Sequence, residues 1–168
     1  MPYASCALSA DPNDDVWQKQ SNMFLQLRHA RHFLSDLKHS LRYGELSRAP
    51  LRLLRFQIVE EIAECDWMAR RHDQWDEDLP RHIQLRHASL QAIRDAIDIR
   101  MLLFDSFPDL ETASVSVFRE SGNYTPEMIL TGTVQRNDQS ARNIHSIVMR
   151  AKILGFRFCL ENDVLIKI

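Results

Sequence analysis

The sequence predicts an α+β fold, in which N-terminal helices pack on a small C-terminal sheet of three or four strands. Two observations favour this class. Apolar residues recur at helical spacing over much of the first hundred residues, and from Thr112 to Ile168 the pattern changes to strand, strand, helix, strand, strand. We therefore expect a flexible tail at 1–15 and a single domain at 16–168, with a mainly helical layer at 16–107 and a ββαββ unit at 112–168.

The first predicted helix begins near Asp14 or Asp15 and runs to Tyr43, and Gly44 stands where a C-terminal cap is expected. Its apolar residues recur at intervals of three and four, which places them on one face. This predicted stripe consists of Phe24, Leu27, Ala30, Leu34, Leu37 and Leu41.

Residues 51–71 fit two structures. Apolar residues at intervals of three and four, together with the helix-favouring run from Glu60 to Glu64, favour a helix. The alternation of Ala63, Cys65 and Trp67 also fits a β-hairpin that turns near residues 60–61. We favour the helix and keep the hairpin as the alternative. The helical stripe would be Leu51, Leu54, Ile58, Ile62, Cys65 and Ala69.

An acidic connection at 72–80 leads to a third predicted helix at about 81–106, which Pro108 closes. The apolar stripe of this helix is Leu90, Ile93, Ile97, Met101 and Phe104.

The C-terminal third begins with a strand at 112–117, in which small apolar and polar residues alternate. A second strand at 128–134 contains Gly132, which suggests a bulge or a close backbone approach. Asn137 or Asp138 would cap a helix that continues through Leu154.

Gly155 would end that helix, and a hairpin would follow it. Its first strand alternates from Phe156 to Leu160, a turn occupies 161–163, and the second strand alternates from Val164 to Ile168.

From Ser89 onward, the order helix, strand, strand, helix, strand resembles the BON domain, a small bacterial α/β module with an L-x-G-x-V second strand. The run LTGTV, from Leu130 to Val134, has this pattern. The resemblance implies a binding or attachment role without catalysis, for which phospholipid surfaces are the suggested partner. It also implies a structural role for Gly132.

Composition and charge describe an ordinary soluble chain, with 45% apolar and 26% charged residues. The formal net charge of −2 argues against a nucleic-acid partner, despite the basic Arg142, His145 and Lys152 of the C-terminal helix. No apolar run is long enough to span a membrane. The N-terminus lacks a signal-peptide pattern, and the three cysteines form no disulfide framework. We expect a cytoplasmic location.

The first helix carries one candidate metal site, formed by His29, His32, Asp36 and His39. Their spacing places them on one arc of about 80° of a helix, and imidazole and carboxylate groups bind zinc or another divalent metal. A single helix cannot surround an ion, so further ligands would be needed. The alternative is that this arc is the solvated face of an amphipathic helix. The further ligands would be His72, His82 or His87.

The acidic connection at 72–80 offers two weaker candidates. Trp75 lies among charged residues and is the tryptophan we would expect at a partner surface or a subunit contact, although we favour core or lid packing for it. The neighbouring carboxylates would bind Ca²⁺ or Mg²⁺, or else cap the next helix and pair with nearby arginines. These carboxylates are Asp73, Asp76, Glu77 and Asp78.

No catalytic motif is present, and Cys65 lies within an apolar pattern typical of a buried structural thiol. We therefore expect a non-catalytic cytosolic binding protein without a cofactor, whose partner is another protein or its own copy, as in a homodimer. The alternative is a metal-dependent or small-molecule enzyme that uses the face of His29, His32, Asp36 and His39.

Overall fold

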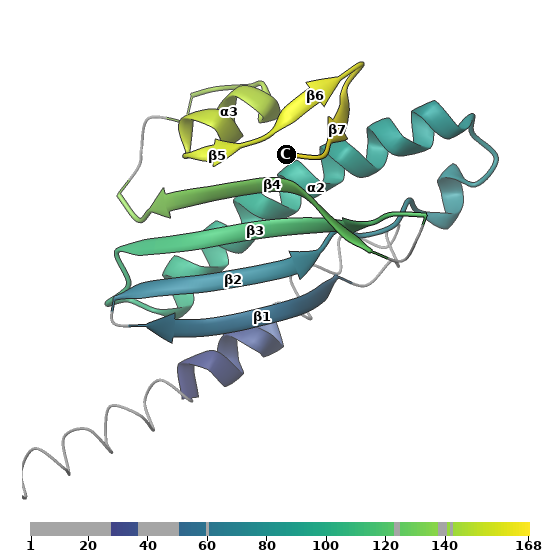
Figure 1. Cartoon of the computed structure of the whole chain (residues 1–168). Coiled ribbons are helices and arrows are strands. Elements are labelled where there is room, and N and C mark those ends of the chain that lie inside the picture. Colours follow the sequence, from purple (N-terminus) through teal and green to yellow (C-terminus); the bar gives the residue numbers. More distant parts are fainter. Residues whose placement is uncertain (1–27, 37–50, 60, 123–124, 138–140, 142) are drawn as a thin grey trace, which may run out of the picture.

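The computed structural model describes residues 28–36, 51–59, 61–122, 125–137, 141 and 143–168. These residues form an α+β structure, as the sequence predicts, with a mixed sheet of order β1-β2-β3-β4-β5 and a separate β6-β7 sheet (Figure 1). The elements are β1 (Arg52–Val59), β2 (Ile62–Met68), the 3₁₀ helix η1 (Gln74–Asp76), α2 (Arg81–Ser106), β3 (Thr112–Glu120), β4 (Pro126–Gln135), α3 (Ile147–Ile153), β5 (Phe156–Arg157), β6 (Cys159–Glu161) and β7 (Val164–Ile166).

The predicted helix at residues 51–71 is wrong, and the hairpin alternative is the observed structure. β1 and β2 pair antiparallel, and β2 also pairs in parallel with β3. The side chains of Ala63, Cys65 and Trp67 are fully buried. A helix turns about 200° over two residues and would point these three side chains in different directions, whereas a strand points them to one face. The main sheet consequently has five strands instead of three or four.

The other face of β1 and β2 carries charged side chains. Arg55 Nε donates to Asp66 Oδ2 at 2.9 Å, and its Nη1 lies 3.2 Å from Glu64 Oε2. Figure 1 shows α2 behind the sheet, and none of the helices described covers the front face. A sheet with one face packed on helices and one face in water explains why polar and apolar residues alternate in these strands.

The predicted helix at about 81–106 is confirmed as α2, which crosses over from β2 to the parallel strand β3. Of its predicted stripe, Ile93, Ile97 and Phe104 are buried, whereas Met101 is 53% exposed. The remaining stripe residue, Leu90, is half-buried.

Three polar residues of α2 are also buried, because each one meets a partner from another element. Ser89 Oγ accepts a hydrogen bond from the backbone N–H of Leu165 at 2.9 Å. Arg100 donates to the carbonyl oxygen of Gln135 at the end of β4. The third, Asp95, pairs with an arginine that follows β2, as described below. These contacts join α2 to β7, to the end of β4 and to the segment that follows β2.

The described part of the first predicted helix is helical at residues 28–36. Its buried side chain is Phe33, whose ring stacks on Phe56 of β1 at a centroid distance of 4.9 Å and also contacts Phe107. Leu34, a member of the predicted stripe, is 39% exposed. The helix is therefore rotated relative to the prediction, because the aromatic rings of β1 and of the end of α2 select Phe33.

The last predicted helix is shorter than expected. Residues 143–146 are not helical, and α3 begins at Ile147 after the N-cap Ser146, whose side chain accepts a hydrogen bond from Met149 N. Arg150 donates from Nε and Nη2 to the carbonyl oxygen of Ile144, at 3.2 and 2.8 Å. These bonds hold the preceding backbone outside the helix, while Asp138 lies outside the described residues.

Gly132 and Gly155 bring β4 and β5 into close contact. Gly155 has φ of +96°, a backbone conformation that side chains disfavour, and it follows Leu154, the C-cap residue of α3. A Cβ atom added to Gly132 would lie 2.7 Å from the Gly155 carbonyl oxygen and 2.9 Å from Phe156 Cα. Both neighbours are backbone atoms, so the strands approach closely only because Gly132 has no side chain.

Replacing Gly132 with alanine should therefore separate β5 from β4 and lower the free energy of unfolding by about 1–3 kcal/mol. Denaturant unfolding measures this change. Gly122→Ala is the matched control, because its added Cβ would meet nothing within 4 Å, and its effect should stay within about 0.5 kcal/mol. Equal effects for the two variants would contradict the close approach.

The chain ends in the predicted hairpin, but the expected strand from Phe156 to Leu160 is divided. β5 joins the main sheet, whereas β6 pairs only with β7. Asn162 and Asp163 adopt φ of 51° and 63° in the connecting turn, a conformation that suits asparagine and aspartate. Among the helices described, none is long and apolar enough to cross a membrane.

Candidate functional site

An apolar groove lies where β4, β5 and the C-terminal residues meet, and we call it the β4–β5 groove. Its volume is about 630 Å³. This is within the range of roughly 300–1,000 Å³ that is usual for binding pockets. It is lined by Met128, Thr131, Lys152, Phe156, Arg157, Phe158, Cys159 and Ile168.

The groove follows from the way the C-terminal third folds. Thr131 and Gly132 of β4 pair with Arg157 and Phe156 of β5, and this pairing closes one end of the groove. Further along β4, the backbone N–H of Ile168 donates to the Met128 carbonyl oxygen at 3.1 Å. The two short pairings leave an open hollow between them, because β5 ends after two residues and β6 turns away.

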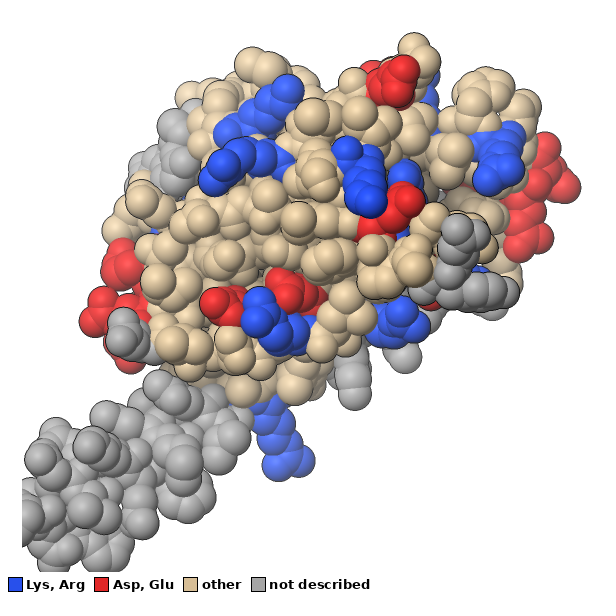
Figure 2. Space-filling view, in the orientation of Figure 1, with Lys and Arg blue, Asp and Glu red and all other residues tan. Residues whose placement is uncertain are grey.

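The groove is positively charged at its rim. Lys152 Nζ lies 5.5 Å from the centroid of the Phe158 ring, a cation–π contact that holds the ammonium group beside the apolar floor. Arg157 is exposed, and none of the lining residues is an aspartate or a glutamate. Figure 2 shows basic side chains over α3 and β5, above a wide uncharged area of the sheet. The rim therefore favours an anionic ligand.

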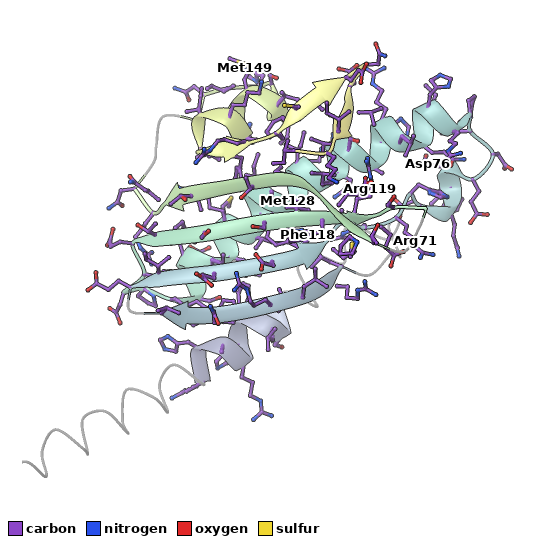
Figure 3. All side chains as sticks on the ribbon, viewed as in Figure 1. Arg71, Asp76, Phe118, Arg119, Met128 and Met149 are labelled. Carbon is purple, nitrogen blue, oxygen red and sulfur yellow. The ribbon has the colours of Figure 1, made fainter. Side chains whose placement is uncertain are left out.

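Exposed apolar side chains lie on the elements next to the groove. Met149 and Lys152 are three residues apart on α3, which places them on the same side of that helix. Met149 is 53% exposed and projects outward from α3 in Figure 3. Ile153, Ile166 and Ile168 are 38–40% exposed. Apolar surface concentrated in this way is typical of a protein interaction site.

The structure describes three of the four candidate metal residues of the first helix, namely His29, His32 and Asp36. His29 is half-buried and its ring lies 5.9 Å from the Phe107 ring, whereas His32 and Asp36 are exposed. No group of three or more potential metal ligands occurs among the described residues, and His39 lies outside them. His32 and Asp36 agree with the alternative of a solvated face, whereas His29 packs beside Phe107.

Trp75 lies on η1 and is 72% exposed, so it does not pack in the core, and its place at a partner surface stays a prediction. Oδ2 of the neighbouring Asp76 lies 3.2 Å from Nδ1 of His87 on α2, within hydrogen-bond distance. This contact fastens η1 to α2.

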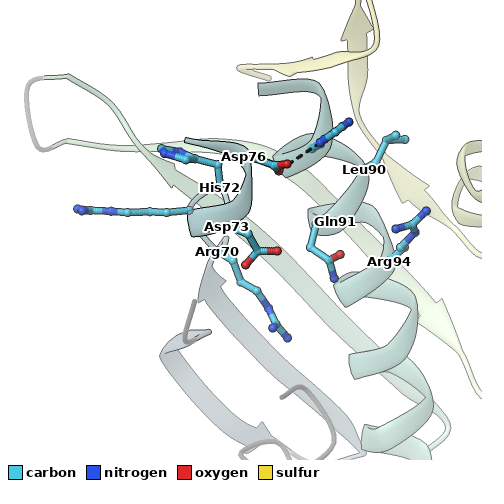
Figure 4. A pocket seen from close by; sticks show the side chains of 10 residues that line it. Arg70, His72, Asp73, Asp76, Leu90, Gln91 and Arg94 are labelled. Atoms are coloured by element: carbon cyan, nitrogen blue, oxygen red, sulfur yellow. Dashed lines mark hydrogen bonds and ion pairs between the residues drawn. The ribbon is translucent and has the colours of Figure 1, made fainter. Parts of the chain in front are cut away.

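A second, polar cavity of about 350 Å³ lies between the η1 region and α2 (Figure 4). At its base, Arg70 Nε donates to Asp95 Oδ2 at 2.9 Å, and Gln91 Nε2 donates to Asp95 Oδ1 at 2.9 Å. Burial raises the pKa of the Asp95 carboxyl, and the charge of Arg70 and the bond from Gln91 oppose that rise. The cavity is lined by Arg70, Arg71, His72, Asp73, Asp76, His87, Ala88, Leu90, Gln91 and Arg94.

The two described cysteines differ in environment. Cys65 is fully buried, and burial, followed by the charge of Asp66, raises its pKa to about 12. Such a thiol is inert, in agreement with its expected structural role. Cys159 is exposed in the β4–β5 groove, and no histidine or carboxylate among the lining residues is available to activate it.

The sequence did not single out Arg157 or Phe158 as site residues. The only local signal was a basic residue between two phenylalanines, Phe156 and Phe158, at the start of a predicted strand. For Lys152, the sequence indicated only that it is one of the basic residues of the C-terminal helix. Their convergence depends on the ending of β5 after Arg157, which the alternating pattern does not predict.

No protein-family model matches this chain, and no curated protein or solved structure shows significant similarity to it. The resemblance of the C-terminal half to the BON domain therefore stays a prediction. The order α2, β3, β4, α3, β5 is nevertheless the one on which that resemblance was based.

Proposed function

We propose that this protein is a non-catalytic binding protein whose β4–β5 groove accepts an acidic segment of a partner protein with apolar side chains. The observation that carries the proposal is the groove itself, which has an apolar floor, two cations at the rim and no acidic side chain among its lining residues. Apolar side chains would bind the floor, and carboxylates would pair with Lys152 and Arg157. A cytoplasmic location belongs to the same proposal.

Two features favour a protein segment over other ligands. The exposed apolar residues of α3 and β7 extend the apolar surface beyond the groove, so a partner larger than a metabolite can bury them. Nucleic acid, in contrast, is bound by exposed aromatic stacking platforms and a strong positive field. Phe156 and Phe158 are only 2% and 7% exposed, and the chain has a net charge of −2.

A charge exchange tests this proposal. We expect the wild type to bind members of a synthetic peptide library that combine leucine or tryptophan with glutamate. The variant Lys152→Glu with Arg157→Glu should bind them at least about 10-fold more weakly, because like charges across an interface repel. Lysine versions of the selected peptides should show the reverse preference. Fluorescence anisotropy with labelled peptides measures both affinities.

The matched control is Arg28→Glu with Arg31→Glu, which makes the same change in net charge on the exposed side of the helix at 28–36. That helix lies beside β1, at the opposite edge of the sheet from β5 (Figure 1). The control should keep wild-type affinity at matched salt. Equal losses in the two double variants would show a non-specific charge effect and would refute the groove as the binding site.

A further inference from the structure

An acidic segment of the kind that suits the β4–β5 groove is present on the surface of this chain. Residues 73–79, with the sequence DQWDEDL, contain η1 and have four carboxylates and no basic residue. Trp75 is 72% exposed and Leu79 is 36% exposed. Glu77 and Asp78 are exposed as well. We call residues 73–79 the acidic segment.

The acidic segment and the groove are complementary in charge and in polarity. The exposed carboxylates of Glu77 and Asp78 equal in number the two cations at the groove rim, Lys152 and Arg157. A tryptophan side chain buries about 150–250 Å² and is a frequent anchor in protein interfaces. The apolar floor of the groove would accept the Trp75 ring without burying a charged group beneath it.

The acidic segment is also held in a fixed position before it meets a partner. Asp76 Oδ2 lies 3.2 Å from His87 Nδ1 on α2 (Figure 4). The backbone N–H of Leu79 donates to the Asp76 carbonyl oxygen at 3.0 Å. A rigid segment loses little conformational entropy when it binds. Asp76 is held against α2, and Figure 3 shows it away from Met128, which lines the groove. We therefore assign the docking to a second copy of the chain.

We propose that the acidic segment of one copy of this chain docks into the β4–β5 groove of a second copy, with Trp75 as the anchor. This inference rests on the proposed function, because it names the source of the acidic partner segment. The two surfaces differ, so the contact is heterologous. Two copies close into a dimer if both segments are exchanged, and otherwise the contact repeats as a ring or a filament.

Complementation between two defective variants tests the docking. Trp75→Ala leaves the groove intact, and the variant Lys152→Glu with Arg157→Glu leaves the acidic segment intact. Sedimentation velocity should show concentration-dependent association of the wild type and association at least about 30-fold weaker for each variant alone, as expected for the loss of an interface anchor. An equimolar mixture of the two variants should form a 1:1 complex, because one functional contact is restored.

The control for the tryptophan is Met101→Ala, which removes a 53% exposed apolar side chain from α2 and should leave association unchanged. Both Trp75 and the groove cations are exposed, so circular dichroism should show folded variants. A wild type that stays monomeric at millimolar concentration, or a variant mixture that forms no complex, would overturn self-docking. If the peptide library still binds the wild-type groove in that case, the proposed function survives and the partner is a different protein.

Discussion

Replacing Arg70 with methionine should lower the free energy of unfolding by about 3–5 kcal/mol, because it leaves a buried carboxylate without its cation. The side chains of Arg70 and Asp95 are only 3% and 0% exposed, and their Nε and Oδ2 atoms lie 2.9 Å apart. The guanidinium joins the segment after β2 to the middle of α2. Denaturant unfolding at pH 7 measures the change.

The double variant Arg70→Met with Asp95→Leu should recover most of the lost stability, because a buried ion pair can often be replaced by apolar side chains. The difference between the double variant and the sum of the single variants gives the coupling energy. A double variant no more stable than Arg70→Met would show that the guanidinium acts mainly through other contacts.

The stability loss of Arg70→Met should also depend on pH. Burial raises the pKa of Asp95, and removing Arg70 takes away the charge that opposes this rise. A carboxyl whose pKa is higher in the folded state than in the unfolded state stabilises the fold fully below its unfolded pKa, and this contribution is lost as the pH rises through the folded pKa. The loss should therefore be smallest near pH 4 and largest at neutral pH. A loss independent of pH would contradict this cause.

Replacing Phe33 with alanine should lower the free energy of unfolding by about 3–5 kcal/mol, as expected for removal of a buried aromatic side chain. Phe33 is fully buried between Phe56 and Phe107, at centroid distances of 4.9 and 5.9 Å. These contacts attach the helix at 28–36 to the same face of the sheet as α2. Thermal and denaturant unfolding both measure the change.

Leu34→Ala is the decisive comparison, because the sequence pattern places Leu34 on the buried stripe, whereas the structure leaves it 39% exposed. Its effect should stay below about 1 kcal/mol. If Leu34→Ala were as destabilising as Phe33→Ala, the helix would be rotated toward the predicted stripe and the observed packing would be wrong.

The sequence was most informative for elements in which the spacing of the apolar residues fits only one type of secondary structure. α2 was predicted at its observed bounds, since its apolar residues recur over 26 residues and prolines stand at both ends. It was least informative at 51–71, where the same apolar residues satisfy both helical and alternating spacing. The parallel pairing of β2 with β3, about fifty residues later, decides between the two.

The candidate site shows the same division. The sequence drew attention to Trp75 and to Gly132, an exposed aromatic among charges and a glycine within a strand. It did not predict the groove, whose residues come from β4, α3, β5, β6, Phe158 between β5 and β6, and Ile168. Each contributes one or two side chains, so no local pattern of spacing or composition marks them as a set.

The amino-acid sequence by itself determined the α+β class, the long helix α2, the C-terminal strands and the final turn, because these depend on local periodicity and on residues such as Gly155 with special backbone preferences. Only the tertiary structure decided that β2 is a central strand, that Phe33 and not Leu34 faces the core, and that Arg70 and Asp95 are buried together. Each of these depends on a partner distant in the chain, and the free energy of such a contact exists only once both partners have been brought together.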